Sequence, residues 1–245
     1  MKIIGFFRSF LVLVLTPVLT FLTSLSAVVA IFFLRLSPKK VQILPKYWAR
    51  IIMRMAGVTV AVTGGQQLAK GAPYIFAANH LSQFDIFALQ GYLDQDFRWM
   101  AKKELFEIPL FGLAMNMVGY IPVDRSHGRQ ALKSLNEAAK RIAAGTSVIV
   151  FPEGTRSKDG KIQPFKSGAM VLALKAGVPI VPVAISGTFQ VMPKGKLLPQ
   201  PGYVSITIGS PVETKNLQTS DKQELAQKIY HEVVALLEGT VAGEN

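Results

Sequence analysis

The sequence predicts an α/β fold over residues 58–245, a sheet flanked by helices, and a membrane-embedded helical segment over residues 1–57. From residue 58 onward, short apolar runs typical of strands alternate with helical runs, and this alternation is typical of α/β sheets. Before that point the chain is apolar and basic. Residues 1–84 hold nine Lys and Arg and no Asp or Glu, so Asp85 is the first acidic residue.

Residues 9–34 form an uncharged run of 26 residues, long enough to span a membrane as a helix. The run is too long for a typical signal-peptide core and no cleavage site with a polar mature start follows, so we expect it to be retained. Pro17 lies inside the run and is expected to kink or break the helix. Hydroxyl side chains at helical spacing predict a face that packs on another helix: Thr16, Thr20, Thr23 and Ser24.

Both flanks of this run are basic, so the positive-inside pattern does not separate them. A helix that breaks at Pro17 and folds back would keep both flanks on one side. We favour this re-entrant hairpin over a single crossing, with the α/β domain on the cytoplasmic side of the cell inner membrane. Residues 46–56 predict a basic amphipathic helix whose aromatic residues suit the headgroup layer, the alternative being an ordinary surface helix packed on the core. We therefore expect membrane-anchoring helices over 1–57 and one further domain over 58–245.

The net charge of +12 is concentrated at the apolar end of the chain. The first 84 residues contribute +9 and the remainder +3, which indicates an anionic membrane surface as partner and no nucleic acid. The chain has no cysteine, which excludes disulfides, thiolate chemistry and cysteine zinc sites.

Seven apolar runs after residue 57 are expected to be strands and five runs to be helices. The expected strands are 58–62, 73–78, 97–101, 119–123, 147–151, 180–185 and 203–208. The expected helices are 84–93, 110–117, 130–144, 167–175 and one from Ser220, with a capping box formed by Ser220 and Gln223. Functional residues of such a sheet lie at the ends of its strands.

The stretch Asn79–Asp85 follows the second expected strand and holds a histidine and a carboxylate five positions apart. On one continuous helix these positions lie roughly 140° apart and do not face each other. The two side chains meet only if His80 precedes the helix and Asp85 lies in its first turns. Asp85 would then accept a hydrogen bond from one ring nitrogen and leave the other as a general base. The alternative is a helix-capping histidine beside a solvated aspartate.

Three further stretches carry charged or polar residues at expected strand ends. Phe151–Ser157 presents a carboxylate, a hydroxyl and a guanidinium around a glycine turn, and its alternative is a turn with a surface ion pair. Gly119–Arg125 ends with an acid–arginine pair, where a lone arginine is usually structural. Lys102 and Lys103 form what is most simply a solvated pair. Pro182 in the run 181–187 predicts an edge strand or a bulge.

Taken together, these stretches resemble the glycerolipid acyltransferase family, specifically bacterial 1-acylglycerol-3-phosphate acyltransferases. The resemblance rests on Asn79–Asp85 as the NHxSxxD box, Gly119–Arg125 as the second block, Phe151–Arg156 as the FPEGTR block and Val181–Gly187 as the proline-containing fourth block. The linking run 101–112 is also family-like, and the similarity covers about residues 58–212.

The resemblance implies a mixed sheet of glycerol-3-phosphate acyltransferase type and transfer of an acyl group from acyl-CoA or acyl-carrier protein to the sn-2 hydroxyl of lysophosphatidate, giving phosphatidic acid. It implies no metal and no cofactor beyond the thioester co-substrate. By matching positions, His80 would be the general base and Asp85 its orienter. Substrate-binding residues would be Glu153 for the glycerol, Arg125, Arg156 and Lys102 for the phosphate, and Gly154 and Thr155 of the same turn.

Other readings remain open at this stage. The acceptor could be another lyso-lipid or glycerol 3-phosphate. A hydrolase with Ser82 as nucleophile is disfavoured, because Ser82 lies only two residues from His80 and no G-x-S-x-G elbow occurs. A non-catalytic lipid-binding protein is disfavoured by the intact His80, Asp85 and Glu153.

Overall fold

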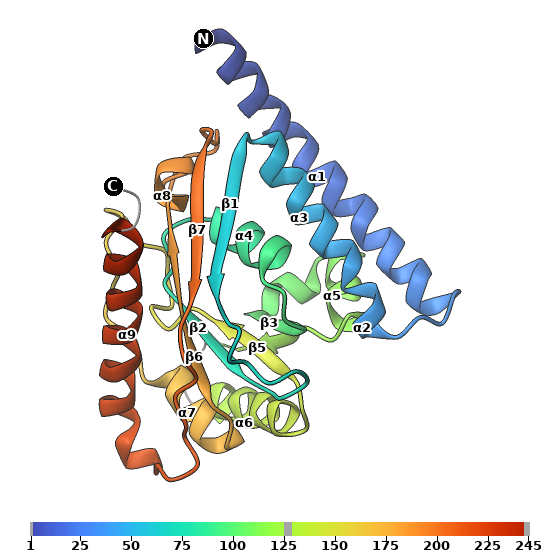
Figure 1. Cartoon of the computed structure of the whole chain (residues 1–245). Coiled ribbons are helices and arrows are strands. Elements are labelled where there is room, and N and C mark those ends of the chain that lie inside the picture. Colours follow the sequence, from blue (N-terminus) through green and yellow to red (C-terminus); the bar gives the residue numbers. More distant parts are fainter. Residues whose placement is uncertain (1, 125–128, 243–245) are drawn as a thin grey trace.

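A computed structural model describes residues 2–124 and 129–242 of the chain. Its centre is a seven-stranded sheet in the order β1-β7-β6-β2-β5-β3-β4 (Figure 1). The strands are β1 (Val58–Gly64), β2 (Ile75–Ala78), β3 (Phe97–Lys102), β4 (Ile121–Val123), β5 (Ser147–Val150), β6 (Ile180–Ser186) and β7 (Gly202–Ile208). All seven predicted strands are therefore confirmed.

The helices in the described part of the chain also follow the predicted order. They are α1 (Lys2–Phe32), α2 (Pro38–Val41), α3 (Ile43–Met55), α4 (Phe84–Tyr92), α5 (Phe111–Met117), α6 (Arg129–Ala143), α7 (Gly168–Ala176), α8 (Thr188–Val191) and α9 (Lys222–Ala242), with 3₁₀ turns at Lys103–Glu107 and Thr219–Asp221. The predicted capping box at Ser220 and Gln223 is wrong. Gln218 and Asp221 form it instead, because the 3₁₀ turn starts the helix earlier.

The sheet is mixed, as expected. β6, β2, β5, β3 and β4 run parallel to one another, whereas β7 is antiparallel to β6 and parallel to β1. The carboxyl ends of β2, β3, β5 and β6 consequently lie at one edge of the sheet, where ligands bind in sheets of this type.

Of the two alternatives predicted at Pro182, the edge strand is wrong, because β6 lies inside the sheet between β7 and β2. The bulge agrees with the pairing: Val183 lies opposite Ile208 but Ile180 lies opposite Val212, so the register changes by one residue across Pro182. Pairing of β6 with β7 begins one residue later, at Val183 opposite Ile208. The carbonyl of Pro182 still accepts a hydrogen bond from Gly209, just beyond the end of β7. The interior strand tolerates the proline because its missing N–H falls at this interruption of the pairing, which resumes at Ile180 opposite Val212.

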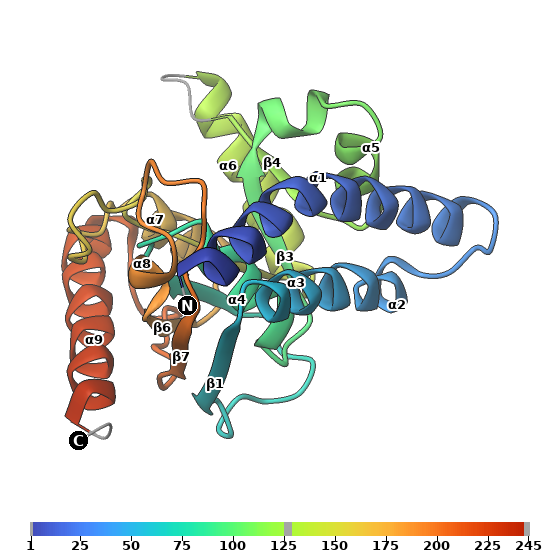
Figure 2. The same ribbon diagram turned by 90° about the horizontal axis from the view of Figure 1, so that it is seen from above.

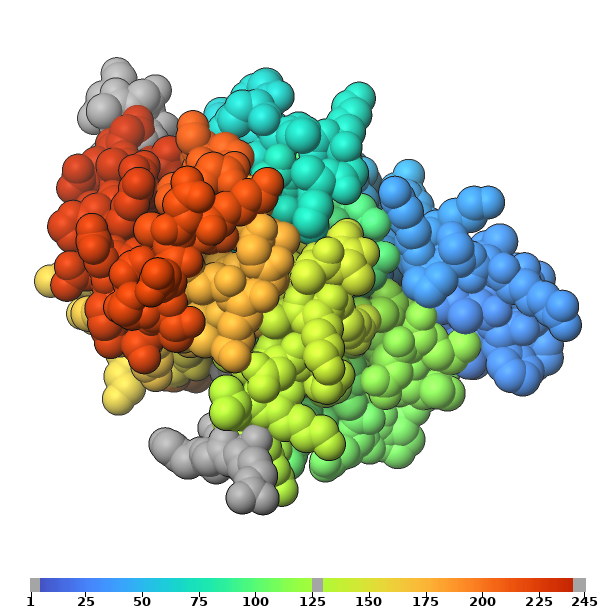
Figure 3. Space-filling view, turned by 90° about the horizontal axis from the view of Figure 1, so that it is seen from below, coloured from blue at the N-terminus to red at the C-terminus, as the bar shows by residue number. Residues whose placement is uncertain are grey.

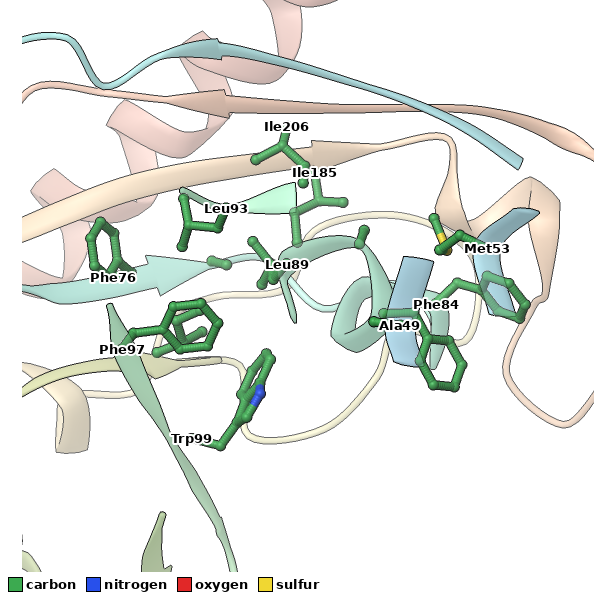
Figure 4. Packing of buried hydrophobic residues seen from close by; sticks show 14 of the residues in the cluster. Ala49, Met53, Phe76, Phe84, Leu89, Leu93, Phe97, Trp99, Ile185 and Ile206 are labelled. Atoms are coloured by element: carbon green, nitrogen blue, oxygen red, sulfur yellow. The ribbon is translucent and has the colours of Figure 1, made fainter. Parts of the chain in front are cut away.

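Two hydrophobic clusters cover the two faces of the sheet. Alternate residues of β2 point to opposite faces, so Phe76 packs with α3 and α4 while Ile75 packs with α6, α7 and α9. Figure 4 shows the first cluster, in which Phe84 and Leu89 of α4 lie between the sheet strands and α3. Figure 3 shows the opposite side, where the C-terminal helix and its neighbours form a continuous surface and the N-terminal helices project beyond it.

Helix α1 is continuous through Pro17, so the predicted break there is wrong. A hairpin does form, but it turns after Phe32 and returns as α3, which lies antiparallel to α1 (Figures 1 and 2). Trp48 of α3 donates a hydrogen bond to Thr20 Oγ1, and this confirms that the hydroxyl face packs on another helix. Helix α1 packs on α3 and α5 and stays helical despite the hydrogen bond that the proline removes, and it bends along its length in Figure 2.

One helix in the described part of the chain, at Gly5–Phe32, is long and apolar enough to cross a membrane by length and composition alone. Many of its large apolar side chains are exposed, among them Phe7, Phe10, Phe21 and Leu22. Exposed apolar surface on this scale marks an interaction site.

Helix α3 is packed more deeply than a helix in the headgroup layer would be. Ala49, Ile52 and Met53 are fully buried, and Lys46 pairs with Asp94 at 2.9 Å. Its buried residues share one core with those of the sheet, so the hydrophobic packing is continuous across residue 57. The predicted amphipathic helix exists, and its apolar residues divide between the protein core, where Ile52 lies, and the surface, where Tyr47 and Ile51 are exposed.

Candidate active site

The candidate site lies where β2, β5 and β6 end. The turn 79–83 follows β2, the loop 151–157 follows β5, and Gly187 with α8 follows β6. The side chain of Asn79 fastens the turn to β6: its amide donates to the carbonyl of Ile185 and accepts from the N–H of the same residue, at 2.9 and 2.8 Å. Parallel strands therefore bring together segments that are distant in the sequence.

His80 and Asp85 meet as predicted. His80 Nδ1 lies 2.8 Å from Asp85 Oδ2, and Asp85 is fully buried at the start of α4. With Asp85 ionised, Nδ1 carries the ring proton and Nε2 keeps a lone pair. The pair has the geometry of a general base and its orienting carboxylate.

Asp85 is held by further donors that keep its carboxylate in place. The N–H groups of Leu81 and Ser82 donate to Oδ2, at 2.7 and 2.9 Å. The hydroxyl of Thr188, fully buried in α8, donates to Oδ1. Position in the first turn of α4 also favours negative charge. Sequence analysis missed Thr188, because 103 residues separate it from Asp85.

The loop 151–157 surrounds His80 from the other side. The ring of Phe151 stacks on the imidazole with centroids 3.8 Å apart and planes within 8°. Glu153 Oε1 accepts a 2.7 Å hydrogen bond from the backbone N–H of His80, and the N–H of Ser157 donates to the carbonyl of His80 at 2.9 Å.

Glu153, which the resemblance assigns to the acceptor glycerol, is buried beside the backbone of His80. It is only 2% exposed, and its second oxygen accepts from the N–H of Gln163 at 3.2 Å. Burial raises the pKa of Glu153 to about 7, against the lowering effect of the two backbone N–H groups, and the charge of Asp85 adds to the rise. Both oxygens thus already contact backbone donors.

Cations gather on the outer side of the same loop. Lys194 Nζ donates to Thr155 Oγ1 and to the carbonyl of Arg156, each at 3.1 Å. Lys166 reaches the turn at Gly154, where its Nζ would lie 3.1 Å from an added Cβ. In the described part of the chain no carboxylate lies within ion-pair distance of Arg156 or Lys194. The sequence offered no signal for Lys194, since it approaches the turn from a separate loop.

The other two predicted cations differ in what can be said of them. Arg125 lies outside the described residues. Lys102, at the end of β3, lies on the wall of the cavity beside His80 and forms an exposed ion pair with Glu104 at 3.0 Å.

An apolar cavity of about 380 Å³ opens at His80 and extends between the sheet and the N-terminal helices. This size is typical of small-molecule sites. Its walls come from α1, α3, α4, α5 and β3, with Trp48, Ile86, Trp99 and Met115 among the lining residues. Trp99 and Tyr120 both donate to Gln90 Oε1, so the polar groups on this wall are paired.

Ser82 is not arranged as a nucleophile. It is fully buried, its hydroxyl donates to the carbonyl of Met192 at 2.7 Å, and it accepts from the N–H of Phe84. This overturns the hydrolase reading based on Ser82. Within residues 2–124 and 129–242, no group of three or more His, Asp or Glu side chains is arranged to hold a metal ion.

Comparison with known proteins agrees with this geometry. The sequence model of the acyltransferase family matches residues 59–186, just over half of the chain. A chloroplastic 1-acyl-sn-glycerol-3-phosphate acyltransferase of Arabidopsis thaliana is 36% identical over 169 residues, 68% of this chain and 47% of the relative. The 1-acyl-sn-glycerol-3-phosphate acyltransferase of Saccharomyces cerevisiae is 36% identical over 191 residues, 76% of this chain and 62% of the relative. The chain thus spans less than two thirds of the length of these relatives.

A solved structure extends the similarity to nearly the whole chain. The crystal structure of the 1-acyl-sn-glycerophosphate acyltransferase of Thermotoga maritima superimposes with a TM-score of 0.72 at 28% identity, covering 93% of this chain and 96% of the other. Since the family match includes the turn with His80 and Asp85 and the loop 151–157, this chain belongs to the acyltransferase family.

Proposed function

We propose that this chain transfers a fatty acyl group from a thioester to the sn-2 hydroxyl of 1-acylglycerol 3-phosphate and so forms phosphatidic acid. The observation that carries the proposal is the His80–Asp85 pair, whose ring lies on the wall of an apolar cavity. Family relatives of the same printed activity support the choice of acceptor.

In the proposed reaction, His80 Nε2 removes the proton of the sn-2 hydroxyl while that oxygen attacks the thioester carbonyl carbon. The tetrahedral intermediate then breaks its C–S bond, and the thiolate takes the proton from the imidazolium. An ester and a free thiol result, with no acyl-enzyme. Asp85 holds the tautomer throughout and stabilises the positive ring. The thioester, acyl-CoA or acyl-carrier protein, is a co-substrate, and the mechanism uses no metal or cofactor.

The phosphate of the acceptor would bind at the outer side of the loop 151–157. A phosphomonoester carries about two negative charges at neutral pH, and guanidinium and ammonium groups donate to its oxygens. The ammonium of Lys194 lies at the Gly154–Thr155 turn beside the backbone of Arg156, and we propose that these two side chains supply the donors. Arg125 and Lys102 remain proposed contributors. An acyl chain would occupy the apolar cavity beside His80.

The chain would act at a membrane, where its lipid acceptor resides. We infer that exposed apolar residues of α1 lie in the bilayer of the cell inner membrane, with the sheet on the cytoplasmic side. A cysteine placed at the exposed Glu213 tests the side, because the chain has no other cysteine. An impermeant thiol reagent should label Glu213→Cys in lysed cells and not in intact cells. Labelling of intact cells would refute the cytoplasmic placement.

The activity itself is tested with purified protein, acyl-CoA or acyl-carrier protein, and a panel of lyso-lipids and glycerol 3-phosphate. Thiol release should be fastest with lysophosphatidate. Faster release with another acceptor would transfer the proposal to that acceptor, and no release with any acceptor would indicate a lipid-binding protein. The two donors, compared in parallel, identify the thioester that the enzyme uses.

A further inference from the structure

One loop holds His80 at three points. Phe151 stacks on its ring, Glu153 accepts from its N–H at 2.7 Å, and the N–H of Ser157 donates to its carbonyl at 2.9 Å. Resting on the proposed acyl transfer, we propose that Glu153 is a positioning residue that fixes the peptide of His80 and does not bind the glycerol of the acceptor.

The surroundings of Glu153 leave no place for an acceptor hydroxyl. The residue is 2% exposed, and each carboxylate oxygen faces a backbone N–H, that of His80 or that of Gln163. Because Glu153 is buried, a glycerol hydroxyl could reach its carboxylate only if the loop 151–157 moved away from His80. That movement would break the hydrogen bond to the His80 N–H and leave this group without an acceptor, which is unfavourable. The cavity beside His80 has Phe151 among its lining residues, and Glu153 is not one of them.

The contacts of Glu153 explain how a group remote from the substrate acts on the reaction. The imidazole is oriented by Asp85 at Nδ1, but the location of Nε2 also depends on where the His80 peptide lies. Glu153 and Ser157 bind the two polar groups of His80's backbone, so they determine that location. Reacting atoms must approach to about 3–3.5 Å, and a misplacement of about 1 Å lowers the rate about hundredfold.

Kinetics of Glu153→Gln with lysophosphatidate as the varied substrate test this assignment. One end of the glutamine amide is a donor and would face a backbone N–H, so only one of the two hydrogen bonds survives. We expect kcat to fall about tenfold to hundredfold with the KM for lysophosphatidate unchanged within about twofold. A KM raised about tenfold at unchanged kcat would overturn the assignment and indicate that Glu153 binds the acceptor. Glu137→Gln, at an exposed ion pair on α6, is the matched control.

A second measurement needs no substrate. Diethyl pyrocarbonate modifies imidazoles, and peptide mass spectrometry follows His80 separately from the exposed His231 of α9. Loosening the His80 peptide weakens the stacking on Phe151, so Glu153→Gln should raise the modification rate of His80 several-fold and leave that of His231 unchanged. An unchanged rate at His80 would overturn the proposal.

The two readouts separate this proposal from the proposed function. If wild-type protein does not acylate lysophosphatidate, the proposed acceptor is wrong, and the kinetics are run with whichever acceptor it uses. The chemical modification still decides the role of Glu153. Glu153→Asp keeps the buried carboxylate but is one methylene shorter and cannot reach both N–H groups. If Glu153→Gln does not fold, Glu153→Asp is measured by the same kinetics and the same chemical modification. A fall in kcat and faster modification of His80 are again expected, and a raised KM or an unchanged modification rate would again overturn the proposal.

Discussion

The turn 79–85 and the loop 151–157 each direct a buried carboxylate at His80, but at different atoms. Asp85 contacts the imidazole Nδ1 from the first turn of α4, whereas Glu153 contacts the backbone N–H from a loop. Asp85 can therefore act on the proton of the ring, and Glu153 on the location of the residue. The role of a carboxylate beside a base therefore depends on which atom of that base residue it contacts.

Removing the proposed base from the turn 79–85 has the largest expected effect on turnover. His80→Ala should lower turnover by about 10² to 10⁴, the usual contribution of a general base, without unfolding the chain. Asp85→Asn should act similarly because the ring then adopts the wrong tautomer. Thiol release measures the loss, and circular dichroism checks the fold. Retention of more than about a tenth of wild-type turnover in His80→Ala would refute the base assignment.

The outer side of the loop 151–157 is expected to contribute to acceptor binding. Hydrogen bonds to charged groups are worth about 1.5 to 3 kcal/mol, so Lys194→Ala and Arg156→Ala should each raise the KM for lysophosphatidate about tenfold or more. An acceptor without phosphate should lose much less. Lys196→Ala, an exposed lysine two positions away, is the control. A raised KM for the thioester alone would assign these cations to the donor's phosphates.

Thr188 supports Asp85 from a third segment, the helix α8. Thr188→Val keeps the shape of the side chain but removes the hydrogen bond to Asp85 Oδ1. We expect kcat to fall about tenfold at unchanged KM, since a charged hydrogen bond of this kind is worth about 1.5 kcal/mol or more. Thr188→Ser keeps the hydroxyl and should restore most of the rate. Equal rates in the serine and valine variants would show that the hydroxyl is not used.

The smallest expected effect concerns the pH dependence of stability at Glu153. Burial raises the pKa of Glu153 from 4.5 to about 7 in the folded chain. The folded state then binds more protons than the unfolded state between these values, so this group's stabilising contribution is greatest below pH 4.5 and is lost as the pH rises through about 7. The Tm difference between wild type and Glu153→Gln should decline from about pH 5 to about pH 8. A constant difference would contradict the raised pKa.

Strands, helices and the neighbourhood of His80 and Asp85 were predictable because they depend on local patterns. Apolar periodicity identified all seven strands. The spacing of His80 and Asp85 showed only that they meet if His80 precedes the helix, and the family resemblance favoured this over a capping histidine; the structure shows the contact. The break at Pro17 was not borne out, because packing of α1 on α3 and α5 supports the helix on both sides of the proline. The amphipathic face of α3 was real, but periodicity does not distinguish protein from headgroups as the surface that covers it.

By itself, the sequence determined the α/β alternation, the apolar first helix and the side-chain types at each strand end, since these follow from residues close together in the chain. Only the tertiary structure decided which groups meet at those ends. The side chain of Asn79 contacts Ile185, that of Thr188 contacts Asp85, and that of Lys194 contacts Arg156, because parallel strands bring their carboxyl ends to one edge of the sheet. The burial of Glu153 was also decided by the tertiary structure, since its partner N–H groups belong to His80, in another segment, and to Gln163, in another turn. Local sequence patterns do not specify such contacts, because the contacting residues come together only when the chain folds.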